Sequence, residues 1–314
     1  IITQERAVLL TDFRYIEQAG NQAGLFEITE YKGETAPAIG KSLKELGIRQ
    51  VAYEHDFISC HEYEELLKNA EGIEFIPLKD LISKLRMIKD EYEIQQIIKA
   101  VEIADNAYTH ILGYIKPGVA EIELAAELEY FMKKNGATGP SFETIVASGV
   151  RASMPHGVAS EKKIEAGEVI TLDFGALYNC YCSDITRTVF LGNPSPELKN
   201  IYKIVLEAQL DALESAVTGI TGKELDGVAR KIISLNSYGE SFGHSLGHGV
   251  GLEIHEKPRV SPHSDIVMEE NMVATIEPGI YVSGLGGVRI EDMVVFKGNK
   301  PMILTKSPKE PIII

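Results

Sequence analysis

The sequence contains no apolar run that approaches the ~20 residues a membrane-spanning helix needs, so we predict that no segment crosses a membrane. It also lacks a surplus of positive charge. Lysine and arginine number 31 against 46 aspartates and glutamates, which gives a formal net charge of −15. A protein that binds the phosphate backbone of a nucleic acid needs a basic surface, so we expect no nucleic-acid partner.

Cysteine is scarce, and the cysteines that are present do not suit a disulfide framework. Cys60, Cys180 and Cys182 form neither an even set nor a C-x-x-C pair. Because free thiols persist in reducing compartments, we expect the protein to reside in one. Nucleotide-binding motifs are missing as well. The tripeptide 173–175 spells the kinase D-F-G but has no H-R-D loop, and residues 219–223 lack Walker A spacing.

The length and composition describe a globular protein of two domains. With 314 residues, 44% hydrophobic and 25% charged, the chain can bury a large core. Residues 1–86 alternate between strand-like and helix-like segments, which predicts a small α/β domain. The strand-like segments are 7–16, 25–31 and 50–54, and the helix-like segments are 37–47 and 61–70. Because Ile1 follows no methionine and lies beside a strand-like segment, we expect this domain to be truncated and to begin upstream.

Residues 87–314 are expected to form a second domain built from two similar halves. Each half has two helical patterns followed by strands: 90–115 and 121–134 in the first half, about 197–217 and 222–235 in the second. The tandem order of helix, helix and strands predicts an internally duplicated α+β architecture, although the halves share no obvious sequence identity.

Residues 169–191 have the pattern of a β-hairpin that carries two carboxylates. Both runs are rich in β-branched residues, and Tyr178-Asn179 is the expected turn between them. With that turn, Asp173 and Asp184 face each other with their Cβ atoms roughly 4.5–5.5 Å apart. Solvent-exposed aspartates beside a turn are the alternative interpretation. Buried like charges so placed are costly unless a cation lies between them, so the spacing favours a metal ion.

The second half offers a matching hairpin and a group of histidines. Glu277 lies in the strand-like A-T-I-E-P-G-I-Y, Glu291 lies in V-R-I-E-D-M-V-V-F, and the turn S-G-L-G-G lies midway between them. These two glutamates are also expected to face each other. Upstream, His244, His248 and His255 fall within twelve residues among glycines. A single histidine is more often an ordinary residue, but three beside two carboxylate pairs favour a functional site.

On these motifs the chain resembles the Xaa-Pro aminopeptidases and prolidases, metallopeptidases with the pita-bread fold. The resemblance covers essentially all of residues 87–314, and residues 1–86 resemble the front domain of these enzymes with its beginning absent. It implies a cytoplasmic homodimer. It also implies that five side chains bind two divalent metal ions, and that two of the five bridge the ions. The five are Asp173, Asp184, His248, Glu277 and Glu291, with Asp184 and Glu291 bridging.

The resemblance also assigns residues around the substrate. His156, in M-P-H-G, and His255 are expected to donate hydrogen bonds to the scissile carbonyl oxygen as charge develops on it. His244 is expected to contact the substrate, and Arg289, in V-R-I-E-D, to support the metal site. Glu277 is the expected proton carrier to the leaving nitrogen.

The implied chemistry is hydrolysis of the peptide bond to proline in short Xaa-Pro peptides. Four carboxylates and one imidazole make an oxygen-rich site that suits Mn²⁺, with Co²⁺ and Zn²⁺ as alternatives. Two ions roughly 3.5–4 Å apart can share a hydroxide, lower its pKa and polarise the scissile carbonyl. Arg259, in H-E-K-P-R, is expected to hold the carboxylate of a dipeptide through its planar bidentate fork. A surface ion pair with an acidic residue is the alternative for Arg259.

Three other functions stay open at this point. Methionine aminopeptidases share the fold and the five ligands, but Arg289 and the front domain favour the prolidase group. Non-catalytic pita-bread modules that bind peptides or proteins lose ligands that this chain keeps, and so do creatinase-like enzymes that work without metal. Bound metal in the purified protein separates these alternatives, and substrate length separates a dipeptidase from an aminopeptidase.

Overall fold

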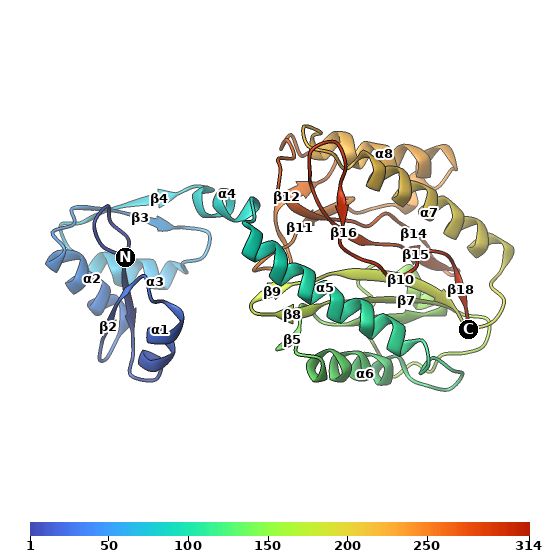
Figure 1. The fold of residues 1–314 in the computed structure, drawn as a ribbon, viewed down its shortest axis with the longest axis horizontal. Coiled ribbons are helices and arrows are strands. Elements are labelled where there is room, and N and C mark those ends of the chain that lie inside the picture. The colour runs from blue at the N-terminus through green and yellow to red at the C-terminus, as the bar shows by residue number, and fades with distance from the viewer. The chain divides into compact units, whose positions relative to one another are not determined.

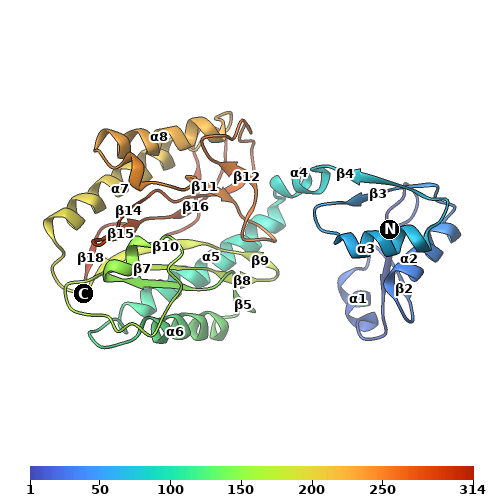
Figure 2. The same cartoon turned by 180° about the vertical axis from the view of Figure 1, so that it is seen from behind.

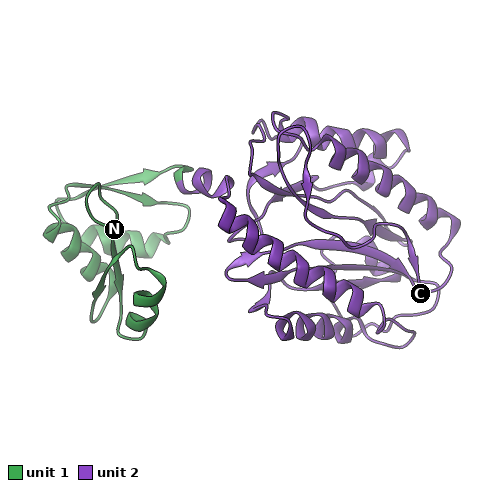
Figure 3. Ribbon diagram, viewed as in Figure 1, with its two compact units in different colours: residues 1–81 green, residues 82–314 purple.

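The computed structural model describes all residues, 1–314, which form two compact units, residues 1–81 and 82–314 (Figure 3). The boundary expected between residues 86 and 87 lies at the end of helix α4 (Leu81–Met87). None of the helices combines the length and the apolar character that crossing a membrane requires.

The first unit is a small α/β arrangement, as the alternating segments predict. Strand β1 pairs in parallel with β2, and β3 pairs in parallel with β4. The strands are β1 (Val8–Thr11), β2 (Glu27–Glu30), β3 (Gln50–Glu54) and β4 (Glu74–Leu78), and the helices are α1 (Ile16–Gln22), α2 (Thr35–Glu45) and α3 (Cys60–Asn69). Helix α1 and strand β4 have no counterpart among the predicted segments, because both are short and only weakly periodic.

The four long helices of the second unit form where the sequence predicts them. They are α5 (Glu91–Ile111), α6 (Glu121–Lys134), α7 (Pro196–Ser215) and α8 (Gly222–Leu235). Local caps explain where they start. Asp90 and Thr221 each form a capping box with a glutamate three residues later, and Ser195 caps α7, whose first residue is proline.

The second unit contains two main sheets that lie between the two pairs of helices (Figures 1 and 2). One sheet has the order β18-β10-β7-β6, and the other has the order β12-β11-β13-β16-β17. The first comprises β6 (Ile145–Ser148), β7 (Val169–Phe174), β10 (Ile185–Phe190) and β18 (Ile312–Ile313); the second comprises β11 (Gly247–Gly249), β12 (Glu256–Val260), β13 (Val273–Ile276), β16 (Asp292–Val295) and β17 (Met302–Ile303). Short ladders join β14 (Gly279–Val282) to β15 (Gly286–Arg289), and β5 (Gly139–Pro140) to β8 (Ala176–Tyr178) and β9 (Tyr181–Cys182).

Alternation along the strands directs polar side chains away from the helices. On β7, Ile170 and Leu172 join the buried cluster formed with α5 and α6, so Asp173 points to the opposite face. On β13, Ala274 and Ile276 join the cluster formed with α7 and α8, so the neighbouring Thr275 points away from that cluster. The faces turned away from the helices carry the predicted carboxylates.

The first hairpin differs from its predicted register. The turn is Asn179-Cys180, both with positive φ (46° and 70°), rather than Tyr178-Asn179, and Asp173 pairs with Thr186. The expectation that Asp173 directly faces Asp184 is therefore wrong. The observed register differs by two positions along one strand, which preserves the face, so the two aspartates remain diagonal neighbours on the same side.

The second hairpin has the predicted register. Ile276 pairs with Asp292 in the β13–β16 ladder, and Gly279 pairs with Arg289 in the β14–β15 ladder. Glu277 and Glu291 lie between these two ladders, at positions that continue the same register. They therefore face each other across the hairpin, as the sequence predicts.

Candidate metal centre

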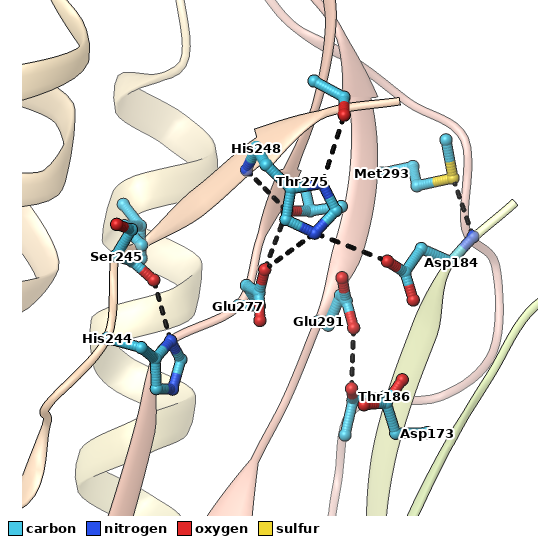
Figure 4. Close-up of polar contacts among 12 residues, drawn as sticks. Asp173, Asp184, Thr186, His244, Ser245, His248, Thr275, Glu277, Glu291 and Met293 are labelled. Atoms are coloured by element: carbon cyan, nitrogen blue, oxygen red, sulfur yellow. Dashed lines mark hydrogen bonds and ion pairs between the residues drawn. The ribbon is translucent and has the colours of Figure 1, made fainter. Parts of the chain in front are cut away.

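The predicted metal ligands meet between the two sheets (Figure 4). One potential ligand atom from each of Asp184, His248 and Glu291 lies within 4.8 Å of the other two. His248 Nε2 is 3.3 Å from Glu277 Oε1 and 3.6 Å from Asp184 Oδ2. Asp173 belongs to the same group through Arg289, which bonds both Asp173 and Thr186, while Thr186 donates to Glu291 at 2.6 Å. Residues more than a hundred positions apart in the sequence thus form one centre.

Several carboxylate oxygens in this centre are buried without a hydrogen-bond partner. They are Asp173 Oδ1, Asp184 Oδ1 and Glu291 Oε1. A buried carboxylate that lacks both a hydrogen bond and a counter-ion is strongly destabilising. Oxygens of this kind, together with one imidazole, fit the coordination of hard divalent cations such as Mn²⁺.

Two carboxylates of the centre, Asp184 and Glu291, have less positive charge beside them than Asp173 and Glu277 have. Burial raises the pKa of Asp184 well above its usual range, and the nearby Glu291 carboxylate adds to the effect. Burial likewise raises the pKa of Glu291 well above its usual range, helped by Glu277 and Asp173. The protein alone therefore disfavours the ionised form of both groups, and a bound cation would reverse that preference.

Asp173 has a cation of its own. Its carboxylate forms a buried ion pair with Arg289, whose Nε also donates to Thr186 Oγ1 at 3.0 Å and whose Nη1 donates to the Tyr281 hydroxyl at 2.7 Å. Burial still raises the pKa of Asp173, although the Arg289 charge opposes the shift. Arg289 thus connects Asp173, Thr186 and Tyr281 beside the centre.

Glu277 is paired with His248. Burial raises the pKa of Glu277, but the hydrogen bond and charge of His248 outweigh it and lower that pKa to about 2. His248 Nδ1 lies 3.1 Å from the Gly249 carbonyl oxygen, an acceptor that fixes the tautomer and turns Nε2 toward the carboxylates. This is the arrangement that a metal-ligating histidine commonly adopts.

The glycines on either side of His248 have a steric cause. Strand β11 lies between β12 and β13, and a Cβ on Gly247 would be 2.0 Å from the Thr275 carbonyl oxygen. A Cβ on Gly249 would be 2.3 Å from the Lys257 carbonyl oxygen. The G-H-G pattern therefore permits a close approach of backbones that brings His248 to the centre.

The other predicted histidines lie around this centre. His244 Nε2 is 2.9 Å from the Tyr281 hydroxyl, and the His255 ring centroid is 4.2 Å from that of His248. Burial lowers the pKa of both His244 and His255, which favours their neutral forms. His156 is exposed, and the preceding carbonyl of Pro155 accepts a hydrogen bond from Arg289 at 3.2 Å.

Arg259 lies opposite His248 in the β11–β12 ladder, so the two side chains share a face. The Arg259 side chain is exposed and makes neither an ion pair nor a hydrogen bond. The alternative of a surface ion pair with an acidic residue is therefore not what the structure has.

Two residues of the centre, Thr186 and Tyr281, are not predicted from the sequence. Thr186 bridges Arg289 and Glu291, and its signal was its place two residues after Asp184, on the same face of the chain. Tyr281 joins His244 to Arg289 through its hydroxyl. Its sequence context is that of an ordinary strand tyrosine and offers no such signal.

Comparison with known proteins agrees with this geometry. Residues 95–297 match metallopeptidase family M24, and residues 1–88 match the Creatinase/Prolidase N-terminal domain. The chain is 48% identical over 314 residues to an Xaa-Pro dipeptidase of Pyrococcus horikoshii, a match that covers 99% of this chain and 87% of the relative.

Solved structures give the same result. An Xaa-Pro dipeptidase from Bacillus anthracis superposes with a TM-score of 0.97 at 51% identity and covers 100% of this chain and 88% of its own. An X-Pro aminopeptidase from Thermotoga maritima superposes with a TM-score of 0.94 at 45% identity, and the match covers 100% of this chain and 89% of the Thermotoga maritima chain. The resemblance found in the sequence, including the pita-bread fold, is confirmed: this chain belongs to metallopeptidase family M24 and carries the Creatinase/Prolidase N-terminal domain.

Proposed function

We propose that this protein is an Xaa-Pro dipeptidase that uses two divalent metal ions, with Mn²⁺ the most active. The observation that carries the proposal is the set of buried, unpartnered carboxylate oxygens around His248. The relatives named as Xaa-Pro dipeptidases support the substrate class.

We assign the metal ligands to the five predicted side chains. Asp184 and Glu291 would bridge the two ions, because each has a carboxylate oxygen within 4.8 Å of a His248 ring nitrogen and burial raises the pKa of both. Asp173 and Glu277 would each complete one side. When bound, the ions would polarise the scissile carbonyl and lower the pKa of the attacking water.

The residues of the chain would then move protons and stabilise charge. The nitrogen of a bond to proline is a tertiary amide, so it has no N–H and must gain a proton to leave. Glu277, which lies beside His248 at the edge of the centre, would be the carrier. His156 and His255 would donate to the carbonyl oxygen as negative charge develops there. His244, held by Tyr281, would contact the substrate.

The direct test is turnover of an Xaa-Pro dipeptide by protein that has been stripped of metal and then reloaded. We expect no hydrolysis in the chelated sample, recovery with Mn²⁺, and little hydrolysis of a matched Xaa-Ala dipeptide. Equal hydrolysis of both dipeptides would exclude specificity for proline.

Arg259 would decide substrate length by binding the carboxylate that a dipeptide carries next to the scissile bond. Its exposed, unpaired guanidinium on the same face as His248 supports this role. For Arg259→Ala we expect kcat/KM for an Xaa-Pro dipeptide to fall roughly 10²-fold, in line with a charge-assisted hydrogen bond.

The matched control is an Xaa-Pro-Xaa tripeptide, which should lose much less in the same variant. Equal losses for the two substrates would make Arg259 structural. They would favour the second candidate, an X-Pro aminopeptidase, which the similarity to the Thermotoga maritima enzyme supports.

We also propose a cytoplasmic homodimer, on the strength of the resemblance to the prolidase group. Light scattering on the purified protein tests the assembly, and a monomer at micromolar concentration would contradict it. Fractionation of cells that express the protein tests the location.

A further inference from the structure

The segment that carries His156 is held by two arginines. Arg289 Nη1 donates to the Pro155 carbonyl at 3.2 Å, one residue before the histidine. Arg151 Nη2 donates to the Val158 carbonyl at 2.9 Å, two residues after it. Arg289 belongs to the metal centre, whereas Arg151 has no assigned role.

Arg151 is itself fixed by a buried acid. Its Nη1 forms an ion pair with Glu121, the first residue of α6, whose side chain is fully buried. The same carboxylate accepts hydrogen bonds from Ser148 N and Oγ at 2.8 and 2.9 Å, and from Ser160 N and Oγ at 3.2 and 2.6 Å. With both oxygens of Glu121 bonded several times, the guanidinium has a rigid anchor.

The position of His156 depends on its backbone. The side chain is exposed and makes no hydrogen bond of its own. The backbone around it is tightly packed: a Cβ on Gly157 would lie 2.9 Å from Ala147 Cβ and 3.2 Å from the Met154 carbonyl oxygen. Contacts to the peptide groups on either side of His156 therefore set the position and direction of its Cα–Cβ bond, from which the imidazole extends.

We propose that Arg151 is a positioning residue, which holds the segment 155–158 so that His156 reaches the scissile carbonyl. The inference rests on the proposed role of His156 as a hydrogen-bond donor. One planar guanidinium bonds Glu121 with one arm and the Val158 carbonyl with the other. A lysine ammonium on its flexible stem can keep the ion pair but cannot reproduce this fork.

The test is Arg151→Lys, alone and in a His156→Ala background, assayed on an Xaa-Pro dipeptide with reloaded protein. We expect Arg151→Lys to lower kcat by about 10-fold, since a displacement of about 1 Å at a catalytic group can cost up to about 10²-fold. Bound metal and the melting temperature should stay near those of the wild type, because the buried ion pair survives. In the His156→Ala background the same change should lower kcat by less than about 2-fold further, because residues that act as one unit are not additive.

A matched control comes from the same polar cluster. Lys162 bonds Ser148 Oγ at 2.9 Å and Glu168 at 2.7 Å but forms no hydrogen bond with the segment 155–158. Lys162→Met should therefore lower the melting temperature without changing kcat. If Lys162→Met lowers kcat as much as Arg151→Lys does, the effect is general loosening and the inference is wrong.

The remaining outcomes separate the inference from the proposed function. If His156→Ala lowers kcat but Arg151→Lys leaves kcat unchanged, only the positioning role of Arg151 is overturned. Losses that multiply in the double variant also overturn it. A His156→Ala variant with wild-type turnover contradicts the proposed role of His156 itself, and the positioning role with it.

Discussion

The two hairpins of the centre carry the same kind of side chain in different geometries. In the first, Asp173 and Asp184 are diagonal neighbours, and in the second, Glu277 and Glu291 face each other. The electrostatic result is nevertheless the same. Each hairpin has one acid close to a protein cation, Asp173 beside Arg289 and Glu277 at 3.3 Å from His248. The other acid is less well compensated: Asp184 lies farther from the shared His248, at 3.6 Å, and the Glu291 side chain accepts a hydrogen bond only from Thr186.

The difference between the hairpins shows which feature matters. Strand register is not shared between them, but the distribution of charge is. Asp184 and Glu291, the acids without a full counter-charge, both have a pKa raised well above the usual range, because burial disfavours their ionised forms. We infer that the carboxylates of the centre carry more negative charge than the protein's own cations balance, and that divalent ions would supply the balancing positive charge.

The largest effect is expected from removing an acid that lacks a counter-charge. Glu291→Gln keeps the shape but removes the charge of a proposed bridging ligand, so we expect loss of bound metal and turnover no higher than that of chelated wild type. Metal analysis and a dipeptide assay measure this. Glu270→Gln, the same change at an exposed position, should leave both unchanged. A Glu291→Gln variant that keeps its metal and half its activity would argue against the bridging role.

A smaller loss is expected at the histidine beside the centre. His255 packs edge-on against His248 with ring centroids 4.2 Å apart, but of these two histidines only His248 lies within ion-pair distance of the carboxylates. For His255→Ala we expect kcat to fall roughly 10²–10³-fold, the usual effect of losing one donor to a developing oxyanion, with metal content unchanged. His263→Ala, at an exposed site, is the control. Loss of metal with normal turnover per bound ion would make His255 a ligand instead.

In metal-free protein, replacing an acid that has an ion pair and replacing an acid that lacks one should change the free energy of unfolding in opposite directions. Asp173→Asn leaves the buried Arg289 without its ion pair, so the free energy of unfolding should fall by about 3 kcal/mol. Glu291→Gln removes a buried acid that has no full counter-charge, so the free energy of unfolding should rise by about 1 kcal/mol. Urea denaturation after chelation measures both. Changes of the same sign would mean that the two classes of acid do not differ.

The helices and one of the two hairpins that position the centre can be predicted from local sequence patterns. The long helices follow from periodicity and caps such as Asp90, and the second hairpin follows from a turn rich in glycine. The first register could not be predicted, because Cys180 adopts a positive φ that its residue type does not signal. The place of Thr186 two residues after Asp184 indicates its face, but its bonds reach Glu291 and Arg289, 105 and 103 residues away, which no local pattern encodes. The contact of Tyr281 with His244, 37 residues away, is likewise not encoded locally.

The most direct test of the account is a calorimetric titration of Mn²⁺ into chelated wild-type protein, with turnover of an Xaa-Pro dipeptide followed in the same samples. We predict binding of two ions per chain, with turnover rising as the centre fills and the melting temperature increasing over the same range. Full turnover before any metal is added, or saturation at one ion per chain, would contradict the claim that Asp184 and Glu291 bind two divalent ions.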